Sequence, residues 1–555
     1  MHLAPSTAWV WLIACAVVIL FFPLAAQFGN LKGKLSSFRT WVWAIALLGI
    51  VAAGFMPFTF DTDIANFEVQ PFIFFITGTL LGVLFLGEFH RMNAQKKLKH
   101  PQRVHAERRT RYSKAVEQLA AYPNPAVRAS ALSTLAGLVD EWLADEQLSV
   151  EARQKEGQVI VNALCAYVRS PFARAFKAEA FESDTPPANY AGDFTTDLAA
   201  FRGEQDVRRS VFVEMSKRSS TLAENEKGEV AVVPGAWSSF EFDFSRAVVF
   251  YPLDGLTIEN ADFSAARFCN GSDFSGAAFV GTVDFSRATF GEIAGFGDAT
   301  FAGDTNFTRA VFNQDVRFSN VTFMGTMDFS NARFAGDAFF RWVAFNANAD
   351  FREASFGGDA DFRDTAFAAD AGFSGASFEG NAGFFRSSFG GNASFFRTDF
   401  AGVAEFREAV FEGHAGFNAA TFYGDAHFSR ATFEGLAGFR DAVFEAGAEF
   451  YGASFVQTAD FCDSSFVKSR PLFVAEGADS GEMRRARFAA LSAGSEATGQ
   501  EAHNFAVYEG SQPIPLGTAE LNGVSYRIPV GTVLFDPASW DERQKEYTRL
   551  SEPSQ

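Results

Sequence analysis

The side chains that most often carry out chemistry are scattered along this sequence without a catalytic or metal-binding spacing. The four cysteines lie far apart, with no CxxC or Cys/His spacing, so we expect isolated apolar residues, neither a disulfide framework nor a zinc site. They are Cys15, Cys165, Cys269 and Cys462. The seven histidines form no triad or cluster, and no Walker loop, HExxH, GxSxG or kinase motif set is present. The sequence therefore predicts a protein with no enzymatic activity, cofactor or metal.

Arginine and aromatic side chains recur at multiples of 22 residues and could bind a partner. Three arginines keep this spacing, a phenylalanine takes the intervening position, and a tyrosine follows further along. Arginine and aromatic residues supply much of the binding energy at protein interfaces. The candidate partner-binding residues, with one further outward phenylalanine, are Arg341, Arg363, Phe385, Phe396, Arg407 and Tyr451. A solvated charged face with a few exposed rings is the competing interpretation.

The element that must position these residues is a long phenylalanine ladder. From Phe263 to Phe466 a Phe falls alternately five and six residues after the last, giving 38 Phe in 19 units of eleven residues. A small residue, usually Ala, lies two positions before nearly every Phe. A fixed short period of this kind is typical of a solenoid. Alternation at period two places Ala and Phe on the inner face of a short strand and polar residues on the outer face.

Units such as Ala354-Ser-Phe356 and Ala426-His-Phe428 resemble the pentapeptide-repeat family over roughly residues 240–470. The resemblance implies a right-handed, four-sided β-helix whose Phe and small residues point inward. Two sides of five residues and two of six would give a coil of 22 residues, and 19 units predict nine to ten coils. The resemblance also implies a structural or protein-binding role.

The sixth residue of the longer sides usually arrives with a Gly-Asp or Gly-Asn pair. Glycine and Asx residues tolerate the positive φ of a tight turn, so we expect them at the corners. Examples are Gly358-Asp359, Gly380-Asn381 and Gly424-Asp425. A calcium site is the competing interpretation of the Asp ladder, but the nine-residue Gly/Asp pattern of calcium-binding β-rolls is absent.

Charge is distributed unevenly along the chain, which has a net charge of −19. Residues 262–466 hold 27 acidic residues, 13 Arg and no Lys, a net charge of −14. This balance argues against a general nucleic-acid binder. Some pentapeptide-repeat proteins mimic DNA and bind a topoisomerase, and this is the alternative to a protein-interaction scaffold. The arginines among the acidic residues argue against it.

Three apolar stretches at the N-terminus predict a membrane domain in residues 1–90. They cover about residues 8–27, 41–58 and 71–86, near the roughly 17–25 residues of a spanning helix. The first loop is basic and the second acidic, so the positive-inside rule places the N-terminus outside and the repeats in the cytoplasm, in a bacterial inner membrane. A basic segment, 91–114, should contact anionic lipid headgroups. The candidate contacts are Arg91, Lys96, Lys97, Lys99 and Arg103. A regulatory part of a transporter or channel is a further alternative.

The remaining segments are expected to space and close the solenoid. Apolar residues at helical spacing predict an α-helical module in 115–216, followed by a linker in 217–239. The β-helix would occupy 240–470 and a small cap 471–555, because an open solenoid end must be covered. Within the cap, residues 526–535 predict one or two strands. Ser539 and Glu542 have the spacing of a capping box for a short final helix. The partner and the oligomeric state are left open.

Overall fold

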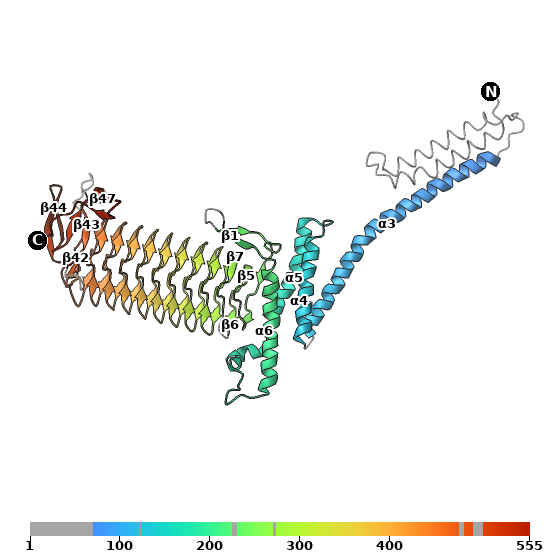
Figure 1. The fold of residues 1–555 in the computed structure, drawn as a ribbon, viewed down its shortest axis with the longest axis horizontal. Helices are drawn as coiled ribbons and strands as arrows, with labels where there is room; N and C mark the ends of the chain where they lie inside the picture. Colours follow the sequence, from blue (N-terminus) through green and yellow to red (C-terminus); the bar gives the residue numbers. More distant parts are fainter. Residues whose placement is uncertain (1–69, 122–123, 225–229, 270–272, 477–481, 492–502) are drawn as a thin grey trace, which may run out of the picture. The chain divides into compact units, whose positions relative to one another are not determined.

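The computed structural model describes residues 70–121, 124–224, 230–269, 273–476, 482–491 and 503–555 (Figure 1). The chain divides into two compact units, Met1–Arg111 and Tyr112–Gln555. Helix α3 (Gln70–Ala121) begins in the first unit and ends in the second. The second unit holds a β-helix with helices at one end and short strands at the other.

The prediction of a membrane domain is contradicted. Among the residues that the structure describes, no helix combines the length and apolar composition that a bilayer crossing requires. The third predicted span, 71–86, lies in α3, and its apolar run ends well before this 52-residue helix does, short of the roughly 20 apolar residues needed. The first two spans lie outside the described residues. The integral-membrane fold class, the inner-membrane localisation and the orientation are therefore wrong.

The basic residues expected at lipid headgroups lie on α3. Arg91 and Arg103 are exposed, and Arg91 lies 3.6 Å from the Glu88 carboxylate. The backbone of Lys96, Lys97 and Lys99 is helical, and their side chains lie outside the description. Contact with headgroups stays a prediction.

The β-helix is built of four faces of short parallel strands. Face 1 runs from β10 (Thr300–Phe301) to β38 (Ser454–Phe455), and face 2 from β11 (Thr305–Asn306) to β39 (Ala459–Asp460). Face 3 is an 11-stranded sheet from β4 (Val248–Val249) to β40 (Ser465–Phe466). Face 4 has eight strands, from β9 (Ala294–Gly295) to β37 (Ala448–Glu449). From β8 (Thr289–Phe290) onward, strands of one face recur every 22 residues, as in Phe301 beside Phe323. The predicted solenoid is confirmed, with about ten turns.

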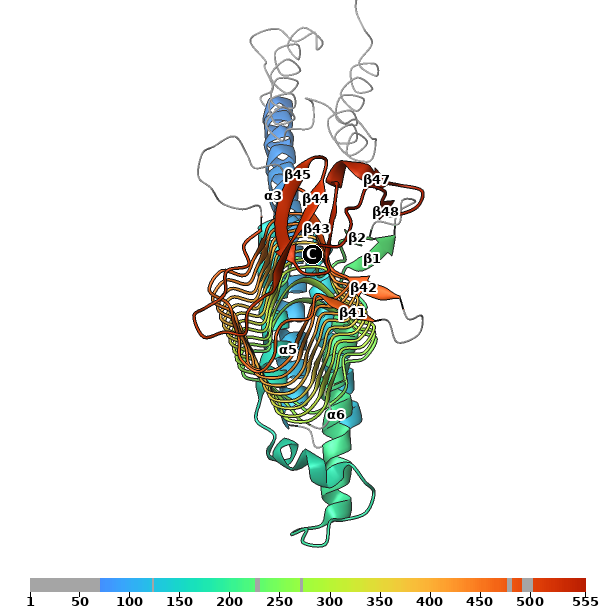
Figure 2. The ribbon, with the colours of Figure 1, turned by 90° about the vertical axis from the view of Figure 1, so that its left-hand side faces the viewer.

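The first coils are less regular than the rest. Strand β3 (Phe242–Asp243) pairs with the end of β5 (Thr257–Asp262), and β6 (Arg267–Phe268) pairs with β4. Strands β5 and β7 (Ala278–Asp284) each run across faces 1 and 2. Figure 2 looks along the β-helix from its C-terminal end, and the later coils superimpose closely.

Phenylalanine rings fill the interior in four columns, one per face. Phe351 stacks on Phe373 of the next coil with centroids 4.8 Å apart and parallel planes. Phe351 also meets Phe362 of its own coil edge-on, at 5.5 Å and 86°. These rings are almost fully buried, as are the small residues two positions before them. Each coil thus buries several large aromatic side chains, and each large side chain contributes roughly 1.5–3 kcal/mol through burial.

The corner glycines have a different role from the predicted one. The positive φ values fall two residues after inward phenylalanines, at positions such as Trp342 (φ 54°) and Glu353 (φ 56°). Gly380 and Gly402 have no such φ. A Cβ atom on Gly402 would instead lie 2.4 Å from the backbone oxygen of Gly380 one coil earlier. Glycine is needed because the coils approach closely here, and the positive-φ prediction for these residues was wrong.

The Asx residue beside each corner glycine bonds to the next coil. The Asp359 carboxylate accepts from the backbone N–H of Asn381 at 2.8 Å, and the Asn381 side chain accepts from that of Val403 at 3.1 Å. These bonds satisfy the backbone N–H of the sixth residue on a long side. The Asx ladder therefore serves the corner and needs no metal to explain it.

Helices cover the first coil. They are α4 (Pro125–Leu143), α5 (Val150–Arg169), a 3₁₀ segment η3 (Ala173–Phe181) and α6 (Phe194–Ser216). The side chains of Asn124, Ser149 and Asp193 cap the three α-helices, as N-cap preferences predict. Phe212 of α6 packs on Phe244 at 4.6 Å, so the helical core continues into the β-helix. A hairpin of β1 (Thr221–Glu224) and β2 (Val230–Val233) follows α6.

The C-terminal residues close the other end. Strand β43 (Arg487–Ala489) pairs with β38, and β46 (Val533–Phe535) pairs with β43. Three antiparallel hairpins surround them: β41 (Val474–Glu476) with β42 (Met483–Arg485), β44 (Leu516–Leu521) with β45 (Val524–Pro529), and β47 (Trp540–Asp541) with β48 (Glu546–Tyr547). The predicted final helix is wrong, because Asp536 caps only the short 3₁₀ turn η4 (Pro537–Ser539).

Candidate functional site

Face 4 carries a groove of about 560 Å³ that contains five of the six predicted partner-binding residues. Each coil presents two outward positions here, directly before and directly after the inward phenylalanine. The second position supplies Arg341, Arg363, Phe385, Arg407 and Tyr451. Because the strands stay in a 22-residue register, residues far apart in sequence form one strip. Whether the strip binds a partner stays a prediction.

Phe396 is the predicted residue that lies elsewhere. It follows the inward Phe395 and therefore belongs to face 2. Its side chain is partly exposed, and the Arg397 guanidinium lies 4.9 Å from the centre of its ring. The six residues thus form a groove of five members and one separate aromatic residue.

A buried carboxylate orients the first two arginines of the groove. Asp361 lies just before an inward phenylalanine and accepts from Arg363, whose Nη2 is 2.7 Å from Oδ2, and from Arg341. Burial disfavours the charged form, but the hydrogen bonds from Arg363 and Arg341 outweigh it and hold the pKa of Asp361 below its usual value. This carboxylate therefore stays ionised at neutral pH and fixes both guanidinium groups.

Two further carboxylates order the other half of the groove. Glu405 accepts from Arg407, with 2.6 Å between Nε and Oε1. Glu408 accepts from both Arg386 and Arg430, at 2.9 and 2.7 Å. The hydrogen bond from Arg386, more than any other interaction, lowers the pKa of Glu408. The guanidinium groups therefore stand in fixed positions between aromatic rings.

The rings lie beside the guanidinium groups. The Arg341 guanidinium is 5.6 Å from the ring centre of Phe339, and that of Arg386 is 4.8 Å from that of Phe385. These distances are in the range of cation–π contacts. Trp342, at the positive-φ corner after Arg341, is 60% exposed. The groove therefore offers flat apolar surfaces and hydrogen-bond donors side by side.

Sequence reasoning missed several groove residues. Arg386, Glu408 and Arg430 keep the same 22-residue spacing as the predicted column, so the period could have identified them. Arg484, which lines one end of the groove, comes from β42 outside the repeats. No period in the sequence points to that residue.

The acidic column on face 2 has a local structural role. The Asp262, Asp284 and Asp328 carboxylates each accept from the backbone N–H two residues later, at 2.7 Å. Asn306 makes the same bond at 2.8 Å. These Asx turns explain the column without a ligand.

The comparisons with known proteins concern the repeat segment. The family model described as pentapeptide repeats (9 copies) matches residues 285–332, 322–366 and 395–442. These matches cover much of the regular β-helix and support the resemblance given by its Ala-x-Phe units. No curated protein and no solved structure matches the chain.

Proposed function

We propose that this chain, whose β-helix is built of pentapeptide repeats, is a non-enzymatic scaffold that binds a protein partner along the groove on face 4. The observation that carries the proposal is the groove itself, where arginines held by Asp361, Glu405 and Glu408 alternate with aromatic rings. Pentapeptide-repeat proteins generally have structural or interaction roles. The partner would present carboxylates or backbone carbonyls to the arginines and apolar side chains to the rings.

Rigidity supports this role. Ordering a free arginine side chain at an interface costs about 0.5–1.5 kcal/mol, and here the carboxylates have already ordered it. The backbone below is held by parallel pairing and stacked rings on both sides. The remaining donor positions of each guanidinium can then contact a partner at little entropic cost.

Photo-crosslinking in cells tests the proposal. A benzoyl-phenylalanine replaces Phe385 in the groove or, as a matched control, Tyr423, which is 55% exposed after an inward phenylalanine of face 3. We expect a discrete protein adduct from position 385 only. We also expect Arg407→Gln to reduce the adduct, because Arg407 lines the groove.

The outcomes separate the alternatives. Equal adducts from both positions, or none from position 385, would contradict binding at the groove. A topoisomerase captured at position 385 would support the DNA-mimic alternative. Circular dichroism of each variant checks that the β-helix is intact.

A further inference from the structure

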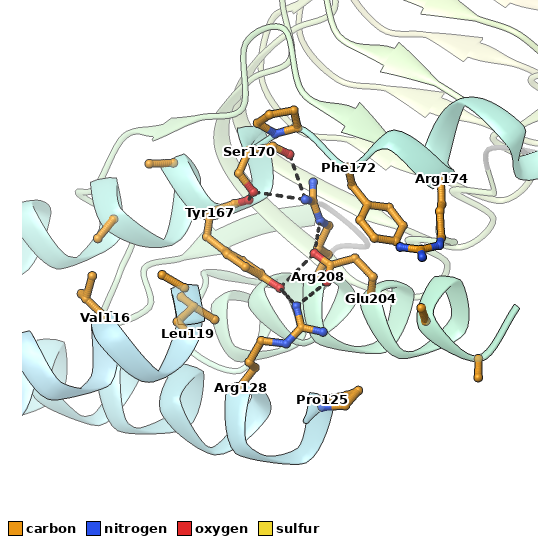
Figure 3. Close-up of a pocket in the computed structure, with 16 residues that line it drawn as sticks. Val116, Leu119, Pro125, Arg128, Tyr167, Ser170, Phe172, Arg174, Glu204 and Arg208 are labelled. Atoms are coloured by element: carbon orange, nitrogen blue, oxygen red, sulfur yellow. Dashed lines mark hydrogen bonds and ion pairs between the residues drawn. The ribbon is translucent and has the colours of Figure 1, made fainter. Parts of the chain in front are cut away.

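A second hollow, independent of the groove on face 4, lies among the helices (Figure 3). Its volume is about 890 Å³, and it lies between the end of α3, the start of α4, the end of α5, η3 and α6. One part of its wall is apolar, with Val116, Leu119 and Phe172, together with alanines of α5 and α6. The other part is a charged network. We call this hollow the helical pocket.

The network centres on the buried carboxylate of Glu204. Its Oε1 accepts from Arg208 Nε at 2.7 Å and from the Tyr167 hydroxyl at 3.0 Å, and its Oε2 accepts from Arg128. Arg128 also donates to the Tyr167 hydroxyl at 3.0 Å. Figure 3 shows these side chains converging from α4, α5 and α6.

The two arginines differ in how their charge is compensated. Arg208, 1% exposed, donates to the backbone oxygens of Val168 and Ser170 at 2.6 and 2.8 Å, where the dipole of α5 favours a cation. Arg128 lies in the first turn of α4, where the helix dipole disfavours a cation. Its Nε is buried without a hydrogen-bond partner in the part of the chain that the structure describes.

The lining of the helical pocket carries one unbalanced positive charge. Burial disfavours the charged form of Glu204, but the hydrogen bonds from Arg208 and Arg128 outweigh it and lower its pKa, so it is ionised. Tyr167 stays neutral, because burial and the Glu204 charge raise its pKa. Arg174, the third cation of the lining, is paired with Asp197 at 2.7 Å. The two remaining guanidinium groups therefore face a single carboxylate.

We propose that the helical pocket binds a small amphiphilic monocarboxylate, with its carboxylate on Arg128 and its apolar body against Val116, Leu119 and Phe172. A planar guanidinium matches a carboxylate well, and a singly charged ligand would balance the single excess charge. The alanines leave room for an alkyl or ring body. A phosphate dianion would bring more negative charge than this lining compensates.

Calorimetric titration of the full-length protein with octanoate tests the assignment. We expect saturable binding at one site, no binding of octanol and no competition by inorganic phosphate. Arg128→Met should weaken octanoate at least tenfold. The matched control is Arg209→Met on α6, which removes the same charge but pairs with Asp254 outside the helical pocket; we expect octanoate affinity to be unchanged.

A second variant keeps the test valid if Arg128→Met fails to fold. Ala166→Trp fills the helical pocket from its apolar side without touching the network, and should also weaken octanoate at least tenfold. Equal binding of octanol, competition by phosphate, or no saturable binding of octanoate would each overturn the proposal. Phosphate competition would reassign the site to phosphate, free or carried by a lipid headgroup.

Discussion

At the scale of single residues, the spacing between coils leaves room for hydrogen atoms alone at the corner glycines. Gly402, Gly413 and Gly424 each face the backbone oxygen of a glycine one coil earlier, and an added Cβ would lie 2.3–2.4 Å from it. A backbone atom held by the ladder on both sides cannot move aside cheaply. These glycines therefore set the distance between neighbouring coils.

We expect Gly402→Ala to destabilise the β-helix by about 1–3 kcal/mol, the range found for overpacked sites. The matched control is Gly416→Ala, where the nearest atom to the new Cβ is 3.9 Å away. That change should leave stability unaltered or raise it slightly, because alanine reduces the freedom of the unfolded chain. Chemical denaturation of both variants measures the difference, and equal effects would contradict the close-approach explanation.

Sequence reasoning at this scale identified the buried residues better than the corners. The inward positions of Phe and Ala followed from the period-two alternation, since the pattern states which face each side chain takes. The reason for Gly402 did not follow, because glycine is compatible with both a positive φ and a close approach. Only the distance to the next coil distinguishes the two.

At the scale of elements, a buried histidine joins the last coils to the C-terminal strands. His503 accepts from the Ala459 N–H at Nδ1, 3.2 Å away, and its Nε2 donates to the Ala489 oxygen at 3.0 Å. Both bonds require the neutral ring. Burial lowers the pKa of His503. A protonated ring would place a second donor against the Ala459 N–H.

We expect acidification to loosen this cap. The unfolded chain protonates near pH 6.5 and the folded chain only at lower pH, so stability is complete above that value and falls as pH decreases through it. Hydrogen exchange at Ala459 and β43, corrected for intrinsic rates, should accelerate at pH 5.5 relative to pH 7.5. His503→Gln keeps an acceptor and a donor but cannot titrate. If it shows the same pH dependence, His503 is not the cause.

The strands of the cap were only partly predictable. Residues 526–535 alternate well enough to indicate strands, and β45 and β46 lie there. The capping-box spacing at Ser539 and Glu542 was misleading, because Asp536 captures the local N–H groups first and a hairpin pairs the following residues. Pairing partners distant in sequence decided the outcome, and they leave no local signal.

At the scale of the whole molecule, a regular β-helix must be closed at both ends. Helices α4–α6 cover the first coil, and Phe473, Phe488 and Phe505 extend the ring columns into the C-terminal cap. The sequence predicted this order of parts because each has its own period. It misled on the membrane, because an apolar run predicts a span only if it also has sufficient length, and residues 71–86 continue into a long helix with a basic middle.

We expect a chain ending at Lys468 to form larger oligomers than the full-length protein. Without the cap, β38–β40 would present unpaired backbone groups, and the end rings Phe455 and Phe461 would be exposed to water. Such an end can pair with another of its kind. Light scattering coupled to size-exclusion chromatography, over a range of concentrations, measures the effect.

The matched variant of the truncated chain places a charge on its exposed edge. Ser454→Lys and Ser465→Lys lie on β38 and β40, outside the ring columns, and lysines on an open edge oppose pairing between strands. They should reduce the size of the oligomers without altering the circular dichroism of the β-helix. If the truncated chain has the same size as the full-length protein, the C-terminal residues are not needed to shield the edge. Their buried contacts would then serve another purpose, such as holding the His503 network in place.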